Sequence, residues 1–151
     1  MTKGRQTSTF AGVGAVVVVG PLPPPAGGMA NQTRQLVELL RSAHADVVLV
    51  QTNAPYLPAW AGQIPVMRAA FRLIPYSWSL WHALGRGQVM HLMANSGWAW
   101  HLFAAPAIWI AWLRGVLVVV NYRGGEADKF LSRSKNLVRF TMRRSAQLIV
   151  P

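Results

Sequence analysis

The stretch AVVVVGPLPPPAGGMANQTRQLVELLRS, residues 15–42, decides the fold of this chain. Its first six residues form a continuous apolar run, which is typical of a parallel strand buried on both faces. A proline-rich loop and the pair Gly27-Gly28 follow, and from Met29 onward the apolar residues recur at helical spacing. The stretch therefore predicts a strand, a tight turn and a helix whose first backbone N–H groups can approach a phosphate or a sugar.

The same alternation of apolar runs and helical patterns continues to the end of the sequence. Further strands are predicted at 46–52, 88–95, 116–122 and 147–151, and the first at 13–20. Helices are predicted at 28–42, at 64–86 with a break or kink at Pro75, at 98–114 and at 132–144. This order predicts an α/β fold, a Rossmann-like, doubly wound and mostly parallel sheet. We expect residues 1–12 to be a frayed N-terminus and residues 13–151 to form one domain.

The charge balance indicates an anionic partner. Lys and Arg number 15 against 4 acidic residues among the 151, which gives a formal net charge of +11. Such an excess favours nucleic acid, a phosphorylated substrate or anionic lipid. No recognition helix or RNA-binding aromatic motif is present, so nucleic acid is disfavoured. Cys is absent and the four His show no metal-ligand spacing, so we predict no metal site.

Two apolar segments have to be compared with targeting or membrane segments. Residues 1–20 have a basic start and an apolar stretch, as a signal peptide does, but the valine run leads directly into the proline-rich loop. Residues 98–120 are long enough for a membrane span, but His101, Pro106, Arg114 and Gly115 interrupt them. A strand in the first segment, and a helix followed by a strand in the second, fit better.

Candidate ligand contacts follow the strands of the predicted sheet, where ligands of such sheets bind. The Gly27-Gly28 turn is one, although neither G-x-G-x-x-G nor a P-loop motif is present. The segment 121–126 is another, because Arg123 could clamp a phosphate and Glu126 could accept hydrogen bonds from sugar hydroxyls. The alternatives are a tight turn and a solvated surface turn. His91, inside a strand, is expected to be a core histidine bonded to the backbone.

Basic and aromatic residues share the interrupted helix around Pro75. Arg68, Arg72, Trp78 and Trp81 suit docking at anionic lipid headgroups, and the alternative is a solvated basic face. The later basic helix is expected to be a solvated face; its cations are Arg133, Lys135, Arg139, Arg143 and Arg144.

Four stretches, taken in order, resemble one enzyme family. They are GPLPPPAGGMANQTRQLVELL (20–40), QVMHLMAN (88–95), VLVVVNYRGGEADKFL (116–131) and AQLIVP (146–151). Together they resemble the N-terminal domain of the family 4 retaining glycosyltransferases, which have the GT-B fold. Each motif is loose, and their order carries the resemblance, which covers nearly the whole chain from Val13. The chain departs from the family pattern at Arg123, where many members carry a histidine before glycine.

The resemblance implies a domain that binds the acceptor and whose glycine-rich loop, here Gly27 and Gly28, approaches a nucleotide-sugar donor. The candidate acceptor or sugar contacts are Asn31, Asn95, Arg123, Gly124 and Glu126. The catalytic residue is unknown, and no cofactor is implied besides the donor substrate. A second Rossmann-like domain would hold most of the donor, so we expect this chain to be truncated before that domain, or separately encoded, and inactive alone.

Two functions therefore remain in competition. The first is transfer of a sugar from a nucleotide-sugar to a cell-envelope or polysaccharide acceptor, either a glycan or a lipid-linked one. The second is a non-catalytic α/β domain that binds a membrane surface. Either function would place the chain in the cytoplasm, with peripheral contact at the inner face of the cytoplasmic membrane left open.

Overall fold

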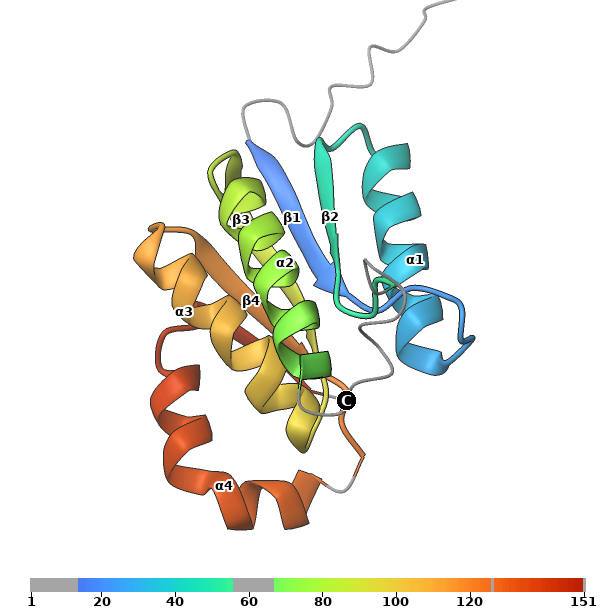
Figure 1. The fold of residues 1–151 in the computed structure, drawn as a ribbon. Helices are drawn as coiled ribbons and strands as arrows, with labels where there is room; N and C mark the ends of the chain where they lie inside the picture. The colour runs from blue at the N-terminus through green and yellow to red at the C-terminus, as the bar shows by residue number, and fades with distance from the viewer. Residues whose placement is uncertain (1–13, 56–66, 126, 151) are drawn as a thin grey trace, which may run out of the picture.

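The computed structural model describes residues 14–55, 67–125 and 127–150. Five strands alternate with helices along the chain (Figure 1). The strands are β1 (Ala15–Gly20), β2 (Val47–Gln51), β3 (Gly87–Ala94), β4 (Leu117–Tyr122) and β5 (Gln147–Ile149). The helices are α1 (Gly28–Ser42), α2 (Met67–Leu84), a π-helical turn η2 (Trp100–Ala104), α3 (Ala105–Leu113) and α4 (Ala127–Met142).

The strands form one all-parallel sheet in the order β2-β1-β3-β4-β5. This confirms the predicted α/β, Rossmann-like fold. The strand order reverses between β1 and β3, because β1 leads outward to β2 and β3 leads the other way to β4. In open α/β sheets, such a reversal marks the place at the carboxyl ends of the strands where ligands bind.

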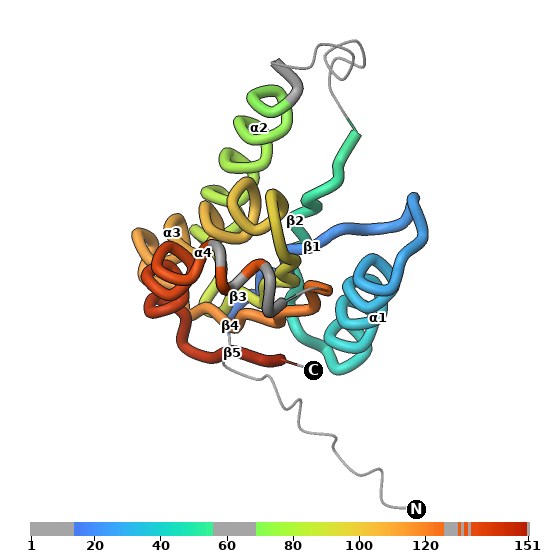
Figure 2. The backbone as a smooth tube through the Cα atoms, turned by 90° about the horizontal axis from the view of Figure 1, so that it is seen from below, coloured from blue at the N-terminus to red at the C-terminus, as the bar shows by residue number. Residues whose placement is uncertain are grey.

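The helices cover the two faces of the sheet unequally. Helix α1 lies on one face, and α2, α3 and α4 lie on the other (Figure 2). The valines of β1 divide accordingly: Val16 and Val18 pack with Val37 beneath α1, and Val17 and Val19 belong to the larger core beneath α2 and α3. In the described part of the chain, no helix covers β3, β4 and β5 on the α1 face.

One predicted boundary needs correction: the last helix was expected at 132–144, but α4 begins at Ala127 and ends at Met142. The segment expected as a helix at 98–114 is helical from Trp98, and its residues Trp100–Ala104 form the π-helical turn η2 before α3. Pro75 lies inside α2, which continues on both sides of it.

A glycine sets the position of α1 against the sheet. A Cβ atom on Gly20 would lie 2.7 Å from the Oγ1 atom of Thr33, which is fully buried. The hydroxyl of Thr33 donates to the carbonyl of Met29 at 2.9 Å. Because nothing larger than glycine fits at the end of β1, α1 packs close there, and its first turn lies at the carboxyl edge of the sheet.

Candidate ligand-binding edge of the sheet

The loops that follow the parallel strands lie at the carboxyl edge of the sheet, and those after β1, β3 and β4 carry the predicted contacts. The loops after β3 and β4 are joined directly. The backbone N–H of Arg123 donates to the carbonyl of Ala94 at 2.9 Å, and the Ser96 hydroxyl donates to the carbonyl of Gly125 at 2.9 Å. Gly124 packs so closely that a Cβ there would lie 2.6 Å from the Ser96 nitrogen. These contacts hold the loops after β3 and β4 as one unit.

The loop after β1 leads into an open start of α1. Gly27, the N-cap residue, has an extended backbone, and no side-chain hydrogen bond caps the helix. The first turn carries no acidic residue, and a Cβ on Gly28 would meet no atom within 4 Å. Asn31 lies in this turn and closes the first helical hydrogen bond, from its N–H to the carbonyl of Gly27 at 2.9 Å. The positive end of the helix dipole therefore faces open space.

Asn53 holds the proline-rich loop in place. Its Oδ1 accepts from the N–H of Leu22 at 2.8 Å and from the side-chain amide of Gln51 at 3.0 Å. Its Nδ2 donates to the carbonyls of Leu22 at 2.7 Å and Pro24 at 3.3 Å. Sequence analysis missed this residue, although a polar side chain just after a buried strand, at the edge where the loops meet, was a signal for it.

A polar row crosses the uncovered part of the sheet toward the same edge. The side-chain Nε of Arg123 donates to the Oδ1 of Asn121 at 2.8 Å, and Nδ2 of Asn121 lies 3.4 Å from the Nε2 of His91. Burial lowers the pKa of His91, so the ring is neutral near pH 7 and its Nε2 can accept this bond. We expected a backbone partner for His91, but the contact through Nε2 is with the Asn121 side chain.

The structure therefore divides the predicted contacts into two groups. Gly27, Gly28 and Asn31 lie at the start of α1, and Asn95, Arg123 and Gly124 lie at the ends of β3 and β4. Strands β1 and β4 are two strand spacings apart, roughly 10 Å, with β3 between them. A ligand that touches both groups has to cross the end of β3. Glu126 lies outside the described residues.

Trp98 is an exposed aromatic side chain that sequence analysis did not select. It follows the loop residues Asn95–Gly97, has 79% of its surface exposed, and contacts the ring of His101 edge-on at 6.3 Å. An exposed indole beside polar loop side chains can pack against the apolar face of a sugar. Its position, directly after a glycine at the end of an apolar strand, was visible in the sequence.

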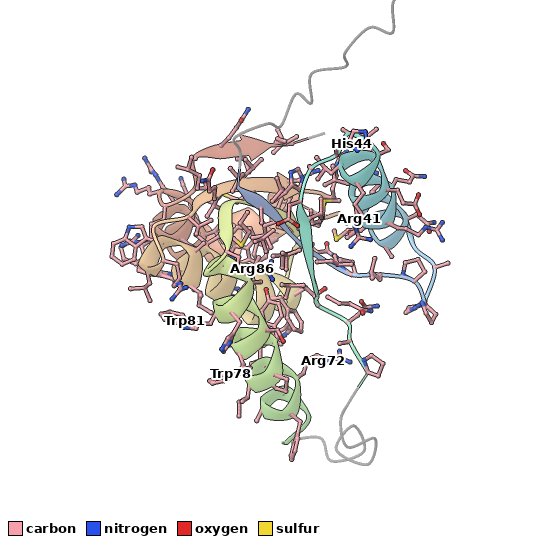
Figure 3. The ribbon with its side chains drawn as sticks, turned by 90° about the horizontal axis from the view of Figure 1, so that it is seen from above. Arg41, His44, Arg72, Trp78, Trp81 and Arg86 are labelled. Carbon is pink, nitrogen blue, oxygen red and sulfur yellow. The ribbon has the colours of Figure 1, made fainter. Side chains whose placement is uncertain are left out.

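The four residues predicted to face a membrane do not share one side of α2. Trp78 and Trp81 are exposed and point away from the sheet, and Arg72 lies on the opposite side of the helix (Figure 3). Arg72 lines a hollow of about 250 Å³ at the end of β2, together with Thr52 and Tyr76. The side chain of Arg68 lies outside the described part of the structure.

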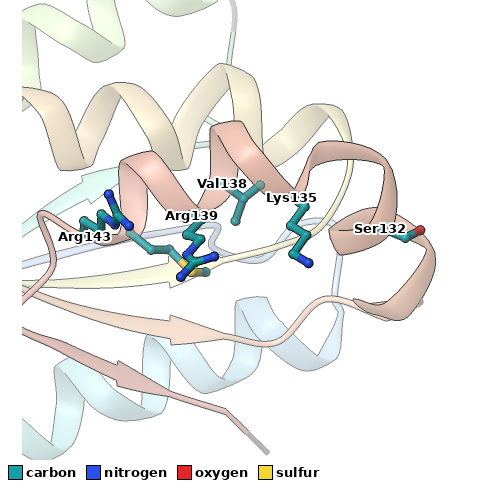
Figure 4. Close-up of a pocket in the computed structure, with 6 residues that line it drawn as sticks. Ser132, Lys135, Val138, Arg139 and Arg143 are labelled. Atoms are coloured by element: carbon teal, nitrogen blue, oxygen red, sulfur yellow. The ribbon is translucent and has the colours of Figure 1, made fainter.

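The basic helix α4 presents exposed cations, as expected of a solvated face, at Lys135, Arg139 and Arg143. Lys135, Arg139 and Arg143 line a hollow of about 530 Å³ with Val138 and Met142 (Figure 4); Ser132 completes the lining. Arg144 instead stacks on Trp109 of α3, with its guanidinium carbon 3.8 Å from a ring centroid. The cations of α4 therefore face two different surroundings. The side chain of Arg133 is not among those described.

Comparison of the chain with protein-family models, with curated proteins and with solved structures finds no match. These comparisons identify no family, and the structure establishes the Rossmann-like architecture. Within the ranges that the structure describes, no helix is both long enough and apolar enough to cross a membrane. The described side chains also hold no group of three or more His, Asp or Glu placed to bind a metal ion.

Proposed function

We propose that this chain is the acceptor-side domain of a glycosyltransferase that uses a nucleotide-sugar donor. One observation carries the proposal: an open Gly-Gly helix start and the Asn121–Gly125 segment share the carboxyl edge, on the two sides of the strand-order reversal. The resemblance of the sequence to family 4 supports it independently. A Rossmann-like fold alone serves many functions, so the argument depends on this edge.

The charges at the edge suit a diphosphate. The start of α1 offers backbone N–H groups and the positive end of a helix dipole, without an acidic side chain in the first turn. Arg123 is exposed at the other end of the edge, and its bond to Asn121 fixes the direction of the guanidinium. Asn31 at the start of α1, and Asn95 and the exposed ring of Trp98 after β3, offer contacts for hydroxyl groups of the donor or acceptor.

In the transfer reaction, an acceptor hydroxyl forms a bond to the anomeric carbon while the bond from that carbon to the diphosphate breaks. The proton of the hydroxyl passes to the departing diphosphate or to solvent. The contribution of this chain is to orient the acceptor and to offset the charge that develops on the diphosphate. A second Rossmann-like domain supplies the remaining donor contacts, so the chain alone transfers no sugar.

The test is nucleotide-sugar binding followed amide by amide. In ¹⁵N-labelled chain, a panel of nucleotide-sugars should shift the N–H signals of Gly27, Gly28 and Asn31 and of the Arg123–Gly124 segment. Gly28→Val should abolish the shifts at the start of α1, because the valine side chain would occupy the space in front of the helix. Gln35→Val, an exposed position later in α1, is the matched control.

Two outcomes would contradict the proposal. One is that no donor in the panel shifts these signals, or that Gly28→Val binds as well as Gln35→Val. The other is sugar transfer by the purified chain without a partner, because this would show that the edge is not half of a shared site.

A further inference from the structure

The outer surface of the helical layer α2–α3–α4 carries solvent-exposed aromatic side chains. Trp78 is 68% exposed, Trp112 52% and Phe140 49%, and Ile74 and Trp81 are exposed as well. Between α2 and α3 this surface contains a hollow of about 630 Å³ with an almost wholly apolar lining; it includes Leu73, Ile74, Pro75, Trp78, Trp81 and Ile110. An exposed apolar patch of this kind marks an interaction site.

Two arginines connect the three helices on this side. The guanidinium of Arg114 lies 4.6 Å from a ring centroid of Trp81, which links the end of α3 to the end of α2. The guanidinium of Arg144 lies 3.8 Å from Trp109 and 4.5 Å from Phe140, which links α4 to α3. Each guanidinium keeps its charge while its face covers an aromatic ring. We call Ile74, Trp78, Trp81, Trp109, Trp112, Phe140, Arg114 and Arg144 together the tryptophan surface.

The described acidic side chains lie elsewhere. Glu38 belongs to α1, on the other face of the sheet, where it pairs with Arg34 at 4.0 Å, and Asp46 directly precedes β2. Among the side chains that the structure describes, the tryptophan surface therefore has no acidic member to neutralise its arginines. With 15 basic residues against 4 acidic ones in the whole chain, its potential is positive.

We propose that the tryptophan surface docks the chain on an anionic lipid bilayer. Indole rings prefer the headgroup region, and aliphatic side chains such as Ile74 gain from burial just below it. The exposed guanidinium of Arg114 can meet lipid phosphates, whereas Arg144 is half-buried and donates to the carbonyl of Phe140 at 2.9 Å, so it contributes positive potential. Nucleic acid would make use of the cations but not of the exposed aliphatic groups and the apolar hollow. This inference goes beyond the proposed glycosyl transfer and does not rest on it. It also replaces Arg72 with Arg114 as the lipid-facing cation.

The test is co-sedimentation of the chain with vesicles of pure phosphatidylcholine, or of phosphatidylcholine and phosphatidylglycerol in equal parts, at low and high salt. We expect binding to the anionic vesicles, reduced by salt. Arg114→Gln should weaken partitioning about 5-fold, since an arginine at an anionic surface contributes about a factor of five. Trp78→Ser/Trp112→Ser should also weaken it, and both side chains are exposed enough for the variant to fold.

The matched controls are on α1, at the opposite face. Arg41→Gln removes the same charge, and Leu39→Ser removes an exposed aliphatic side chain. Both should bind vesicles nearly as the parent does. Equal losses in the α1 and tryptophan-surface variants would overturn the proposal, as would equal binding to neutral vesicles. Dimer formation through this surface, or binding to RNA, with no vesicle binding would assign it to another partner.

Discussion

Adjacent glycines in the Arg123–Gly125 loop should respond in opposite ways to one added methyl group. At Gly124, a Cβ would lie 2.6 Å from the backbone nitrogen of Ser96, and 2.7 and 2.8 Å from the Oη and Cζ atoms of Tyr122. Carbon atoms in normal contact are about 3.5–4.0 Å apart, so the loops would have to separate by roughly 1 Å. At Gly125, a Cβ would meet nothing within 4 Å.

The expected magnitudes follow from these distances. Because the atoms that a Gly124→Ala methyl meets are backbone and a buried ring, overpacking should cost about 1–3 kcal/mol of unfolding free energy. A loss of about 2 kcal/mol corresponds to a fall in Tm of about 4–8 °C for a chain of this size. Gly125→Ala should be neutral, or should stabilise by up to about 1 kcal/mol, by restricting the unfolded chain.

Urea and thermal unfolding of the two variants, measured side by side, test this. The variants have the same composition, so any difference between them reports local geometry. If Gly124→Ala is as stable as Gly125→Ala, the loops after β3 and β4 are not in contact, and the description of the ligand-binding edge is wrong. Nucleotide-sugar binding by Gly124→Ala should also weaken, because the loop that carries Arg123 moves with it.

Two further predictions concern side chains that hold this edge. Burial lowers the pKa of His91 in the folded chain, whereas in the unfolded chain the pKa is about 6.5. Below about pH 6.5 the unfolded chain therefore binds a proton at His91 more readily than the folded chain does. The free energy of unfolding consequently falls as the pH drops. In urea titrations between pH 7 and pH 5, His91→Gln should lose less stability than the parent; parallel losses would exclude His91 as the cause. Asn53→Ala should cost about 1–3 kcal/mol in the same assay at pH 7, because it leaves both backbone groups of Leu22 without their partner. Asn95→Ala, which removes only an exposed local bond to the next residue, should cost less, and equal costs would show that Asn53 does not hold the loop.

The sheet was predictable because its strands carry their own signal. The valine run of β1 is apolar on both faces, and such a strand fits only the middle of a covered parallel sheet. The helical spacing after Gly28 gave α1 its bounds. The start of α4 was predicted too late in the chain, because the helix begins among polar residues with no apolar periodicity before Phe130.

The side-chain arrangement was less predictable, because it depends on contacts between elements far apart in the chain. Nothing near Arg144 in the sequence indicates that it stacks on Trp109, thirty-five residues earlier. The separation of Arg72 from Trp81, however, could have been predicted from the sequence. Nine residues are two and a half turns of an α-helix, so the two side chains must lie on opposite sides of α2. Sequence analysis nevertheless grouped Arg72 with Trp78 and Trp81.

The ends of the helices relate the two proposed surfaces to each other. Helices in parallel α/β units run opposite to the strands, so their last turns lie at the amino edge of the sheet. Trp81, Trp112 and Phe140 are in the last turns of α2, α3 and α4, and Arg114 and Arg144 follow them. Much of the tryptophan surface therefore lies at the amino edge of the sheet, opposite the edge that holds Gly28 and Arg123.

This placement gives a last prediction. A chain docked through the tryptophan surface would keep its ligand-binding edge clear of the bilayer, because Gly28 and Arg123 lie at the edge of the sheet opposite to Trp81, Trp112 and Phe140. Nucleotide-sugar binding, measured by equilibrium dialysis, should then be unchanged when saturating anionic vesicles are added. The acceptor would have to reach out from the bilayer or arrive from solution, which favours a glycan chain over a short lipid headgroup. Competition between vesicles and nucleotide-sugar would show that both use the same side of the molecule, and one of the two assignments would have to be withdrawn.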